Sequence, residues 1–149
     1  MRALLDVNVL IALLDAAHIH HRAAHHWLAQ YKDGWATCPI TVNGCLRILS
    51  QPSYPGALPV ADIAGRLTDA THSPSHAFWP DSLDLLHNDS LDWTKILGHR
   101  QVTDVYLLAL ALDHGGCFAT FDQRIQHQVL NSARVEHLVM IPTRRDRKP

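Results

Sequence analysis

The sequence predicts an α/β protein in which a parallel sheet of about five strands is flanked by helices on both faces. Short apolar runs alternate with longer segments of helical periodicity along most of the chain. The apolar runs contain few polar residues, as expected for parallel strands that are buried on both faces. With 149 residues and no evident repeat or interdomain linker, the chain is predicted to form one domain over residues 1–142. Residues 143–149 are expected to form a basic, disordered tail.

Five short segments are the expected strands. Gly34 separates the second strand from the helix before it, and Pro80 ends the third. The expected strands are Ala3–Leu5, Trp35–Cys38, Ala77–Trp79, Cys117–Phe121 and His137–Ile141.

The segments between these strands have the periodicity of helices. Thr41 is the expected N-cap of the third helix, and Gly115 with Gly116 stops the fifth. Residues 51–59 hold three prolines and a glycine and are predicted to form a loop. The expected helices are Val9–Leu14, His20–Lys32, Thr41–Leu49, Val60–Ala70 and Thr103–Asp113, with a short helix at Gln123–Leu130 and weak helicity at Leu91–Leu97.

Composition gives little indication of a partner. The formal net charge is -1, so the overall charge does not indicate a nucleic-acid-binding protein. An active site can nevertheless bind phosphate through metal ions. The three cysteines, Cys38, Cys45 and Cys117, lack a C-x-x-C spacing and are interpreted as small core residues in a reducing cytoplasm. No apolar run approaches the roughly 18 residues of a membrane span, so we expect a soluble, cytoplasmic protein.

Three aspartates are placed where a ligand site is expected in a parallel sheet. Asp6 follows the first strand, Asp122 follows the fourth, and Asp104 lies in the first turn of the helix that leads into the fourth. Because ligands bind outside the carboxyl ends of parallel strands, these side chains are expected to converge. Taken singly, Asp104 is also explained by the helix dipole and Asp122 by an ordinary turn.

Three converging carboxylates predict a site for a hard cation. Their charges repel, and a divalent ion relieves that repulsion. Mg²⁺, or Mn²⁺ in its place, is the natural occupant of an all-oxygen site and is used for phosphate chemistry.

Several spaced motifs resemble one known family. The segments LLDVNVLIALL, HRQVTDVYLLALA and FATFDQR, in that order, resemble the PIN-domain ribonucleases, and more closely the VapC toxins of bacterial toxin–antitoxin pairs. The stretches HIHHRAAHHWL and WATCPITVNGCLRILSQPSYP fit the same subgroup, so the resemblance covers about residues 2–141. It implies a Mg²⁺-dependent endoribonuclease that hydrolyses RNA phosphodiester bonds.

The resemblance also implies roles for individual residues. Asp6 and Asp104 match catalytic aspartates that bind the metal directly or through water, and Asp122 matches the acid that completes the cluster. The neighbours Asn8, Thr103 and Thr120 match polar residues that are expected to hydrogen-bond around the metal ligands.

One position departs from the family pattern. Many members carry a glutamate at the position of Val42, and valine can neither ligate a metal nor accept a proton. Natural variation and an engineered substitution both remain open as its origin. The departure leaves two functional hypotheses: an active nuclease, or a catalytically weakened or inactive protein that binds antitoxin or RNA without turnover.

The resemblance further implies partners. It predicts a homodimer, a VapB-like antitoxin whose C-terminal segment blocks the acidic cleft, and a structured substrate such as transfer or ribosomal RNA. Arg47 and Arg124 lie close in sequence to the cleft elements and are expected RNA contacts. The basic tail is either a solubilising terminus or an arm that contacts phosphate.

Other functions are less consistent with the residues. His21 and His25 lie four apart on a helix, as in some zinc sites, but no local acid or cysteine completes a tetrahedral set. No G-x-G-x-x-G follows the first strand, and no lysine fits the late-strand position of a phosphate-accepting receiver domain.

Overall fold

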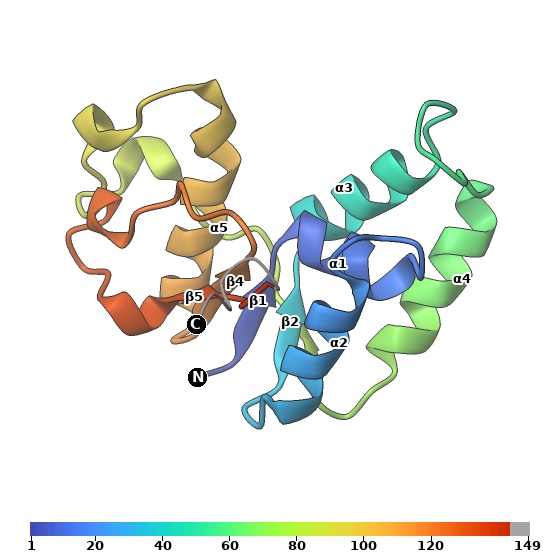
Figure 1. The fold of residues 1–149 in the computed structure, drawn as a ribbon. Helices are drawn as coiled ribbons and strands as arrows, with labels where there is room; N and C mark the ends of the chain where they lie inside the picture. The colour runs from blue at the N-terminus through green and yellow to red at the C-terminus, as the bar shows by residue number, and fades with distance from the viewer. Residues whose placement is uncertain (144–149) are drawn as a thin grey trace, which may run out of the picture.

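A parallel sheet forms the centre of the protein, whose computed structural model describes residues 1–143. Every pair of neighbouring strands is parallel, so the predicted α/β fold class with about five strands is confirmed. The strands are β1 (Ala3–Leu5), β2 (Trp35–Thr37), β3 (His76–Phe78), β4 (Cys117–Thr120) and β5 (Leu138–Met140), in the spatial order β3-β2-β1-β4-β5 (Figure 1).

The central strand β1 marks the point where the order of the strands reverses. From β1 the chain moves outward through β2 to β3, and it then returns to β4 on the other side of β1. Leu4 of β1 is paired with Ala36 of β2 on one side and with Phe118 of β4 on the other. In open parallel sheets this crevice, at the carboxyl ends of the strands, is where ligands bind.

Each face of the sheet has its own hydrophobic core. Leu4 and Phe118 belong to the core that packs against α5 (Val102–Asp113). Leu5, the next residue of β1, belongs to the opposite core. That core is covered by α1 (Val7–Leu14), α2 (His21–Gln30), α3 (Pro39–Leu49) and α4 (Val60–Thr71), which lie together on the right of Figure 1. The alternation follows from the period of two along a strand, and it confirms helices on both faces.

The start of α3 differs from the prediction. Thr41 was expected as the N-cap, but the helix begins at Pro39 and Cys38 is its N-cap. Proline fits the first helical position because its fixed φ suits the helix and no partner is needed for the missing N–H. The Thr41 hydroxyl instead accepts a hydrogen bond from the backbone N–H of Cys38 at 3.0 Å. This shift sets which face of the helix each residue of α3 occupies.

The prediction of a short helix at residues 123–130 was wrong. Only the single 3₁₀ turn His127–Val129 forms there. Asp122 accepts a hydrogen bond from the backbone N–H of Arg124, and Leu130 forms an antiparallel bridge with Leu91. Gln126 and Leu130, on either side of the 3₁₀ turn, have extended backbones, and the bridge between Leu130 and Leu91 uses that conformation instead of a helical one.

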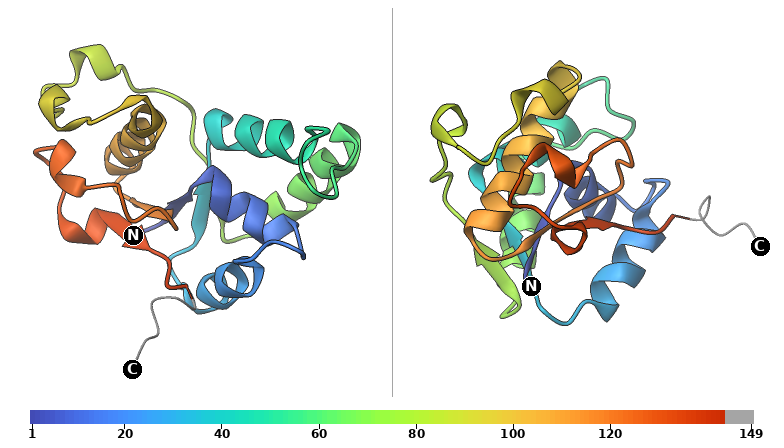
Figure 2. Two further views of the ribbon diagram at one scale, coloured as in Figure 1. Left: turned by 45° about the horizontal axis from the view of Figure 1, so that its top comes forward. Right: turned by 90° about the vertical axis from the view of Figure 1, so that its left-hand side faces the viewer.

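The weak helicity expected at residues 91–97 is reduced to the 3₁₀ turn Trp93–Lys95. The backbone N–H of Asp92 donates to the carbonyl of Val129, which ties this segment to the one after β4. Two further 3₁₀ turns, Leu85–His87 and His99–Gln101, complete the connection between β3 and α5, drawn in yellow-green in Figure 2.

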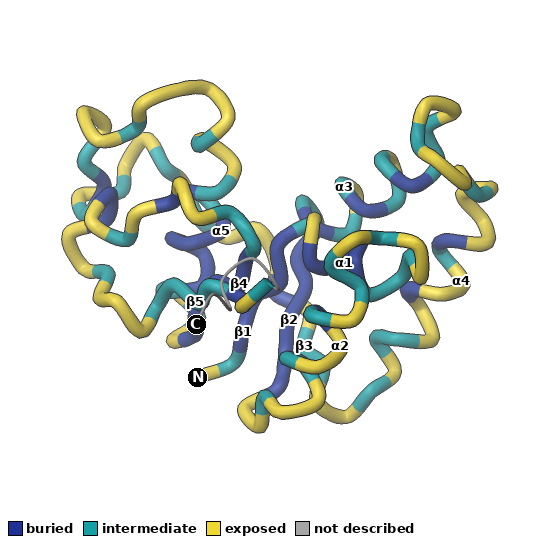
Figure 3. The backbone as a smooth tube through the Cα atoms, in the orientation of Figure 1, coloured by how far each residue is buried: buried dark blue, intermediate teal, exposed yellow. Residues whose placement is uncertain are grey.

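The remaining boundaries agree with the prediction to within about two residues, which is the usual uncertainty of helix and strand ends. Burial follows the architecture: β1, β2 and β4 are buried, whereas most of the connection between β3 and α5 is exposed (Figure 3). Cys38, Cys45 and Cys117 are buried free thiols, as expected for core residues. Apart from Thr143, the predicted tail lies outside the described residues.

Within residues 1–143, no helix is long and apolar enough to cross a membrane.

Candidate active site

Asp6 is fixed at the carboxyl end of the central strand. It directly follows β1 and is only 5% exposed, although its neighbours in the sheet are apolar. The hydroxyl of Thr120 donates a hydrogen bond of 2.7 Å to its Oδ2 atom. Burial raises the pKa of Asp6, while the bond from Thr120 and the backbone N–H groups of Val7 and Asn8 lower it. The carboxylate is therefore held in one orientation in an environment that disfavours an uncompensated charge.

Asp104 approaches the same edge from the other face of the sheet. It lies in the first turn of α5, where the helix dipole favours an acid. Its pKa is nevertheless raised to about 7, first by burial and then by the negative charges of Asp6 and Asp122. The three predicted aspartates are thus close enough to influence one another's ionisation, even though they come from distant parts of the chain.

Asp122 completes the group from the segment after β4. Its backbone N–H donates to the Thr120 hydroxyl at 3.0 Å, so Thr120 connects the ends of β1 and β4. Its carboxylate accepts bonds from Arg124, from Nε at 2.9 Å and from Nη2 at 2.6 Å. These bonds are the main reason why the pKa of Asp122 is held below its usual value.

The polar neighbours expected from the family pattern fall into two groups. Thr120 is buried and hydrogen-bonds Asp6, as expected of a residue that orients a ligand. Asn8 and Thr103 are exposed, and within residues 1–143 neither side chain hydrogen-bonds one of the three aspartates. A role for these two near the metal stays a prediction.

The chemistry of the three side chains suits a divalent metal. Carboxylate oxygens are the preferred donors for Mg²⁺ and Mn²⁺. The pKa of Asp104 is raised first by burial and then by the charges of Asp6 and Asp122, and a cation would stabilise this carboxylate against both. As arranged, no three acid, histidine or cysteine side chains in residues 1–143 are grouped to hold an ion. The bonds from Arg124 engage the third carboxylate in this arrangement.

Val42 does not lie where an additional acid was expected. It lines a groove on the far side of α3, together with Leu46 of the same helix and Ala64 and Leu67 of α4. None of the three aspartates lines that groove. Val42 therefore faces α4. Gly44, by contrast, faces α1: a Cβ atom placed there would lie 2.8 Å from the side chain of Val7, the residue after Asp6.

The two arginines expected to contact RNA are placed differently. Arg47 is exposed on α3, on the same helical face as Ile40, which packs against the core beneath α5. Arg124 is not a free surface cation, because it is paired with Asp122. RNA contact by either stays a prediction.

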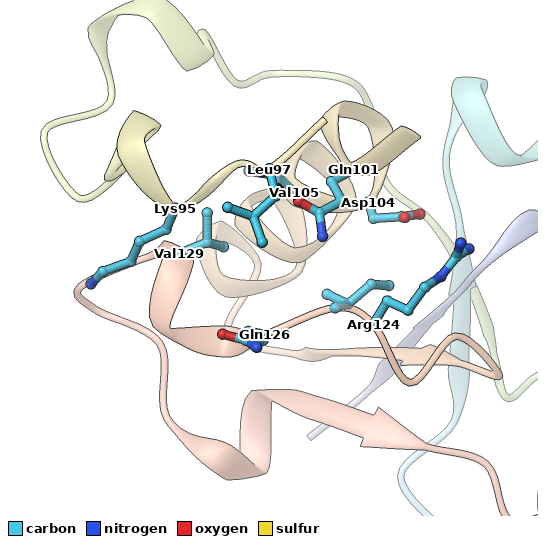
Figure 4. A pocket seen from close by; sticks show the side chains of 9 residues that line it. Lys95, Leu97, Gln101, Asp104, Val105, Arg124, Gln126 and Val129 are labelled. Carbon is cyan, nitrogen blue, oxygen red and sulfur yellow. Dashed lines mark hydrogen bonds between the residues drawn. The ribbon is translucent and has the colours of Figure 1, made fainter. Parts of the chain in front are cut away.

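Sequence reasoning missed a small pocket that adjoins Asp104. Arg124 and Asp104 reach in the same direction at one end of it (Figure 4). Its volume is about 30 Å³, room for roughly one water molecule. No sequence signal marks its walls, because they come from three separate segments: Lys95, Leu97, Gln101, Val105, Ile125, Gln126 and Val129.

Comparisons with known proteins identify the family of this chain. Residues 3–129 match the family described as PIN domain, and the chain belongs to that family. Ribonuclease VapC44 of Mycobacterium tuberculosis is 46% identical over 95% of this chain and 100% of the relative. Ribonuclease VapC39 of the same organism is 45% identical over 82% of this chain and 89% of the relative. The resemblance seen in the motifs is thus confirmed.

A solved structure shows the same fold at low sequence identity. Mycobacterium tuberculosis VapC20, described as a sarcin–ricin loop cleaving toxin, matches with a TM-score of 0.52 and 14% identity. The match covers 80% of this chain and 87% of that protein.

Proposed function

We propose that this protein is a metal-dependent endoribonuclease and the toxin of a toxin–antitoxin pair. The observation that carries the proposal is the convergence of Asp6, Asp104 and Asp122 at the switch point of a PIN-domain sheet, with the pKa of Asp104 raised to about 7. The relatives described as ribonucleases, VapC44 and VapC39, support the same reaction class.

Each aspartate has a part in this proposal. Asp6, oriented by Thr120, and Asp104 would bind Mg²⁺ or Mn²⁺, and Asp122 would complete the site. When bound, the ion would stabilise charge on the phosphate and activate water for in-line attack. Hydrolysis adds water across the phosphorus–oxygen bond, which leaves a 5′-phosphate and a 3′-hydroxyl. The carboxylates hold the reacting groups in place without forming a covalent intermediate.

The partners follow from the same family assignment. We propose a VapB-like antitoxin that inserts an arginine among the carboxylates, where a guanidinium mimics the charge of a metal. A homodimer, a cytoplasmic location, and transfer or ribosomal RNA as substrate are part of the proposal.

The alternative, binding of antitoxin or RNA without turnover, depended on Val42. Because Val42 lies in the groove toward α4, its identity does not remove a side chain from the aspartate group. The comparisons with VapC ribonucleases also favour the active enzyme.

The proposal is tested by titrating Mg²⁺ and Mn²⁺ into RNA cleavage assays. Replacing Asp6 or Asp104 by Asn is expected to lower the cleavage rate by at least about 100-fold, because each change removes a charged ligand. Asp69→Asn, an exposed acid on α4, is the matched control and should cleave like the wild type. Full activity in Asp6→Asn or Asp104→Asn would contradict the assignment.

A further inference from the structure

Arg124 forms an ion pair inside the group of catalytic aspartates. Its Nη2 lies 2.6 Å from Asp122 Oδ2, and its Nε lies 2.9 Å and 3.2 Å from the two carboxylate oxygens. Its backbone N–H also donates to Asp122 Oδ1 at 2.9 Å. The carboxylate is therefore gripped by both the side chain and the backbone of one residue.

The guanidinium also acts on the neighbouring acid. Arg124 and Asp104 line the same small pocket, so the positive charge lies beside a second carboxylate. Arg124 thus supplies the positive charge that three crowded carboxylates require when no metal is bound. Among residues 1–143, the ion pairs include no other cation bound to one of these aspartates.

Other nearby cations are not equivalent. Lys95, which lines the small pocket beside Asp104, donates to the carbonyl of Gln128 and pairs with Asp92. Arg47 is exposed on α3 and forms none of the described ion pairs. Arg124 is therefore the cation whose position affects the aspartates directly.

We infer that Arg124 is an exchangeable counter-ion of the active site: it holds Asp122 in the metal-free protein, and releases it to grip a phosphate of the RNA once the carboxylates take up a divalent ion. This inference rests on the proposed function. It explains why the three aspartates converge and yet no three acids are grouped to hold an ion in the present arrangement.

The side chain of Arg124 is suited to both partners. It is 69% exposed, so it can change direction without disturbing the core. A guanidinium binds carboxylate and phosphate in the same two-pronged manner, and an arginine keeps its charge in both states. Release of Arg124 toward solvent would place its positive charge beside the RNA phosphate that is bound at the catalytic aspartates.

The test measures metal binding and RNA binding separately from cleavage. Free Mn²⁺ is followed by electron paramagnetic resonance in titrations of the wild type, Arg124→Gln and Arg47→Gln, the matched control. Binding of a fluorescein-labelled single-stranded RNA of mixed sequence is then measured with and without Ca²⁺. A denaturing gel run afterwards shows whether the RNA is intact.

We expect Arg124→Gln to bind Mn²⁺ about 3- to 10-fold more tightly than the wild type, because removing a partly exposed ion pair frees Asp122. The same variant should lose most of the gain in RNA affinity that Ca²⁺ gives the wild type. Arg47→Gln should bind Mn²⁺ like the wild type.

Unchanged or weaker Mn²⁺ binding by Arg124→Gln would overturn the inference, as would an undiminished gain in RNA affinity. Asp104→Asn separates this failure from failure of the proposed function. If Arg124→Gln gives one of these results while the wild type binds Mn²⁺ and Asp104→Asn does not, the metal site stands and only the role of Arg124 is refuted. If the wild type and Arg124→Gln both fail to bind Mn²⁺, the metal site and the counter-ion role are refuted together.

Discussion

At the scale of single residues, the site depends on how the negative charge of each carboxylate is stabilised. Asp6 is compensated by Thr120 and backbone N–H groups, and Asp122 by Arg124. Within residues 1–143, Asp104 accepts no comparable bond, and burial followed by the charges of Asp6 and Asp122 raises its pKa to about 7. The least compensated carboxylate is the one from which a metal would relieve most repulsion.

This difference predicts a pH effect on stability. The folded-state pKa of Asp104, about 7, lies above the ordinary aspartate value of 3.8, so the folded protein binds the proton more tightly than the unfolded chain. The resulting penalty is absent below about pH 4, grows as pH rises toward 7 and is complete above it. Without metal, Asp104→Asn should therefore exceed the wild type in stability by roughly 1–2 kcal/mol at pH 8, after allowance for partial solvent exposure.

Urea unfolding in EDTA at pH 4 and pH 8 checks this effect. The two proteins should nearly converge at pH 4, which is close to the ordinary aspartate pKa of 3.8, because most of the penalty is lost there. A stability difference that stays the same at both pH values would contradict the assigned cause.

At the scale of secondary-structure elements, the orientation of α3 directs Val42 away from the aspartates. Val42 faces α4, and Gly44 faces α1. The close packing of Gly44 on Val7 holds the beginning of α1, and with it the backbone that follows Asp6. The family motif identified the helix, but the phase of that helix decides where an acid at each position would point.

The orientation of Val42 predicts the effect of adding an acid there. Val42→Glu should change Mn²⁺ affinity by less than about twofold and should lower the free energy of unfolding by roughly 1–2 kcal/mol, because a carboxylate is forced against apolar side chains. Asn43→Glu, at the exposed neighbouring position, is the matched control and should be near neutral in stability. Thermal unfolding and Mn²⁺ titration provide the measurements.

A tenfold gain in Mn²⁺ affinity from Val42→Glu would show that this position reaches the aspartates after all. In that case the missing glutamate of the family pattern would be the reason for a weaker site.

At the scale of the whole molecule, the site brings together residues from elements on both faces of the sheet. Asp6 and Asp122 follow neighbouring strands, whereas Asp104 comes from the helix that covers the opposite face from α1. Binding a cation to all three would connect both layers of helices through the sheet. A ligand that binds only the folded state raises stability in proportion to the logarithm of its concentration.

Metal binding should therefore be visible in global unfolding. At a Mn²⁺ concentration about 100 times the dissociation constant, the free energy of unfolding should rise by about 2.7 kcal/mol. Differential scanning calorimetry with and without Mn²⁺ measures this rise, and Asp104→Asn should show little of it. An equal rise in Asp104→Asn would place the stabilising ion elsewhere on the protein.

The sequence by itself determined the fold class, the nearly continuous buried strands, and the identity of the three aspartates at the edge of the sheet. These features are local: apolar runs, helical periodicity and acids at strand ends are visible in neighbouring residues. The motifs around Asp6, Asp104 and Asp122, in their order along the chain, also indicated the family.

Only the tertiary structure decided how those residues are compensated. The bond from Thr120 to Asp6 and the repulsion at Asp104 join atoms more than 15 residues apart in the chain, so no local pattern contains them. The same holds for residues 123–130, where partners after β4 and at Leu91 replaced the expected helix. The side-chain orientation of Val42 depended on how α3 packs against α1 and α4, which are contacts between separate elements.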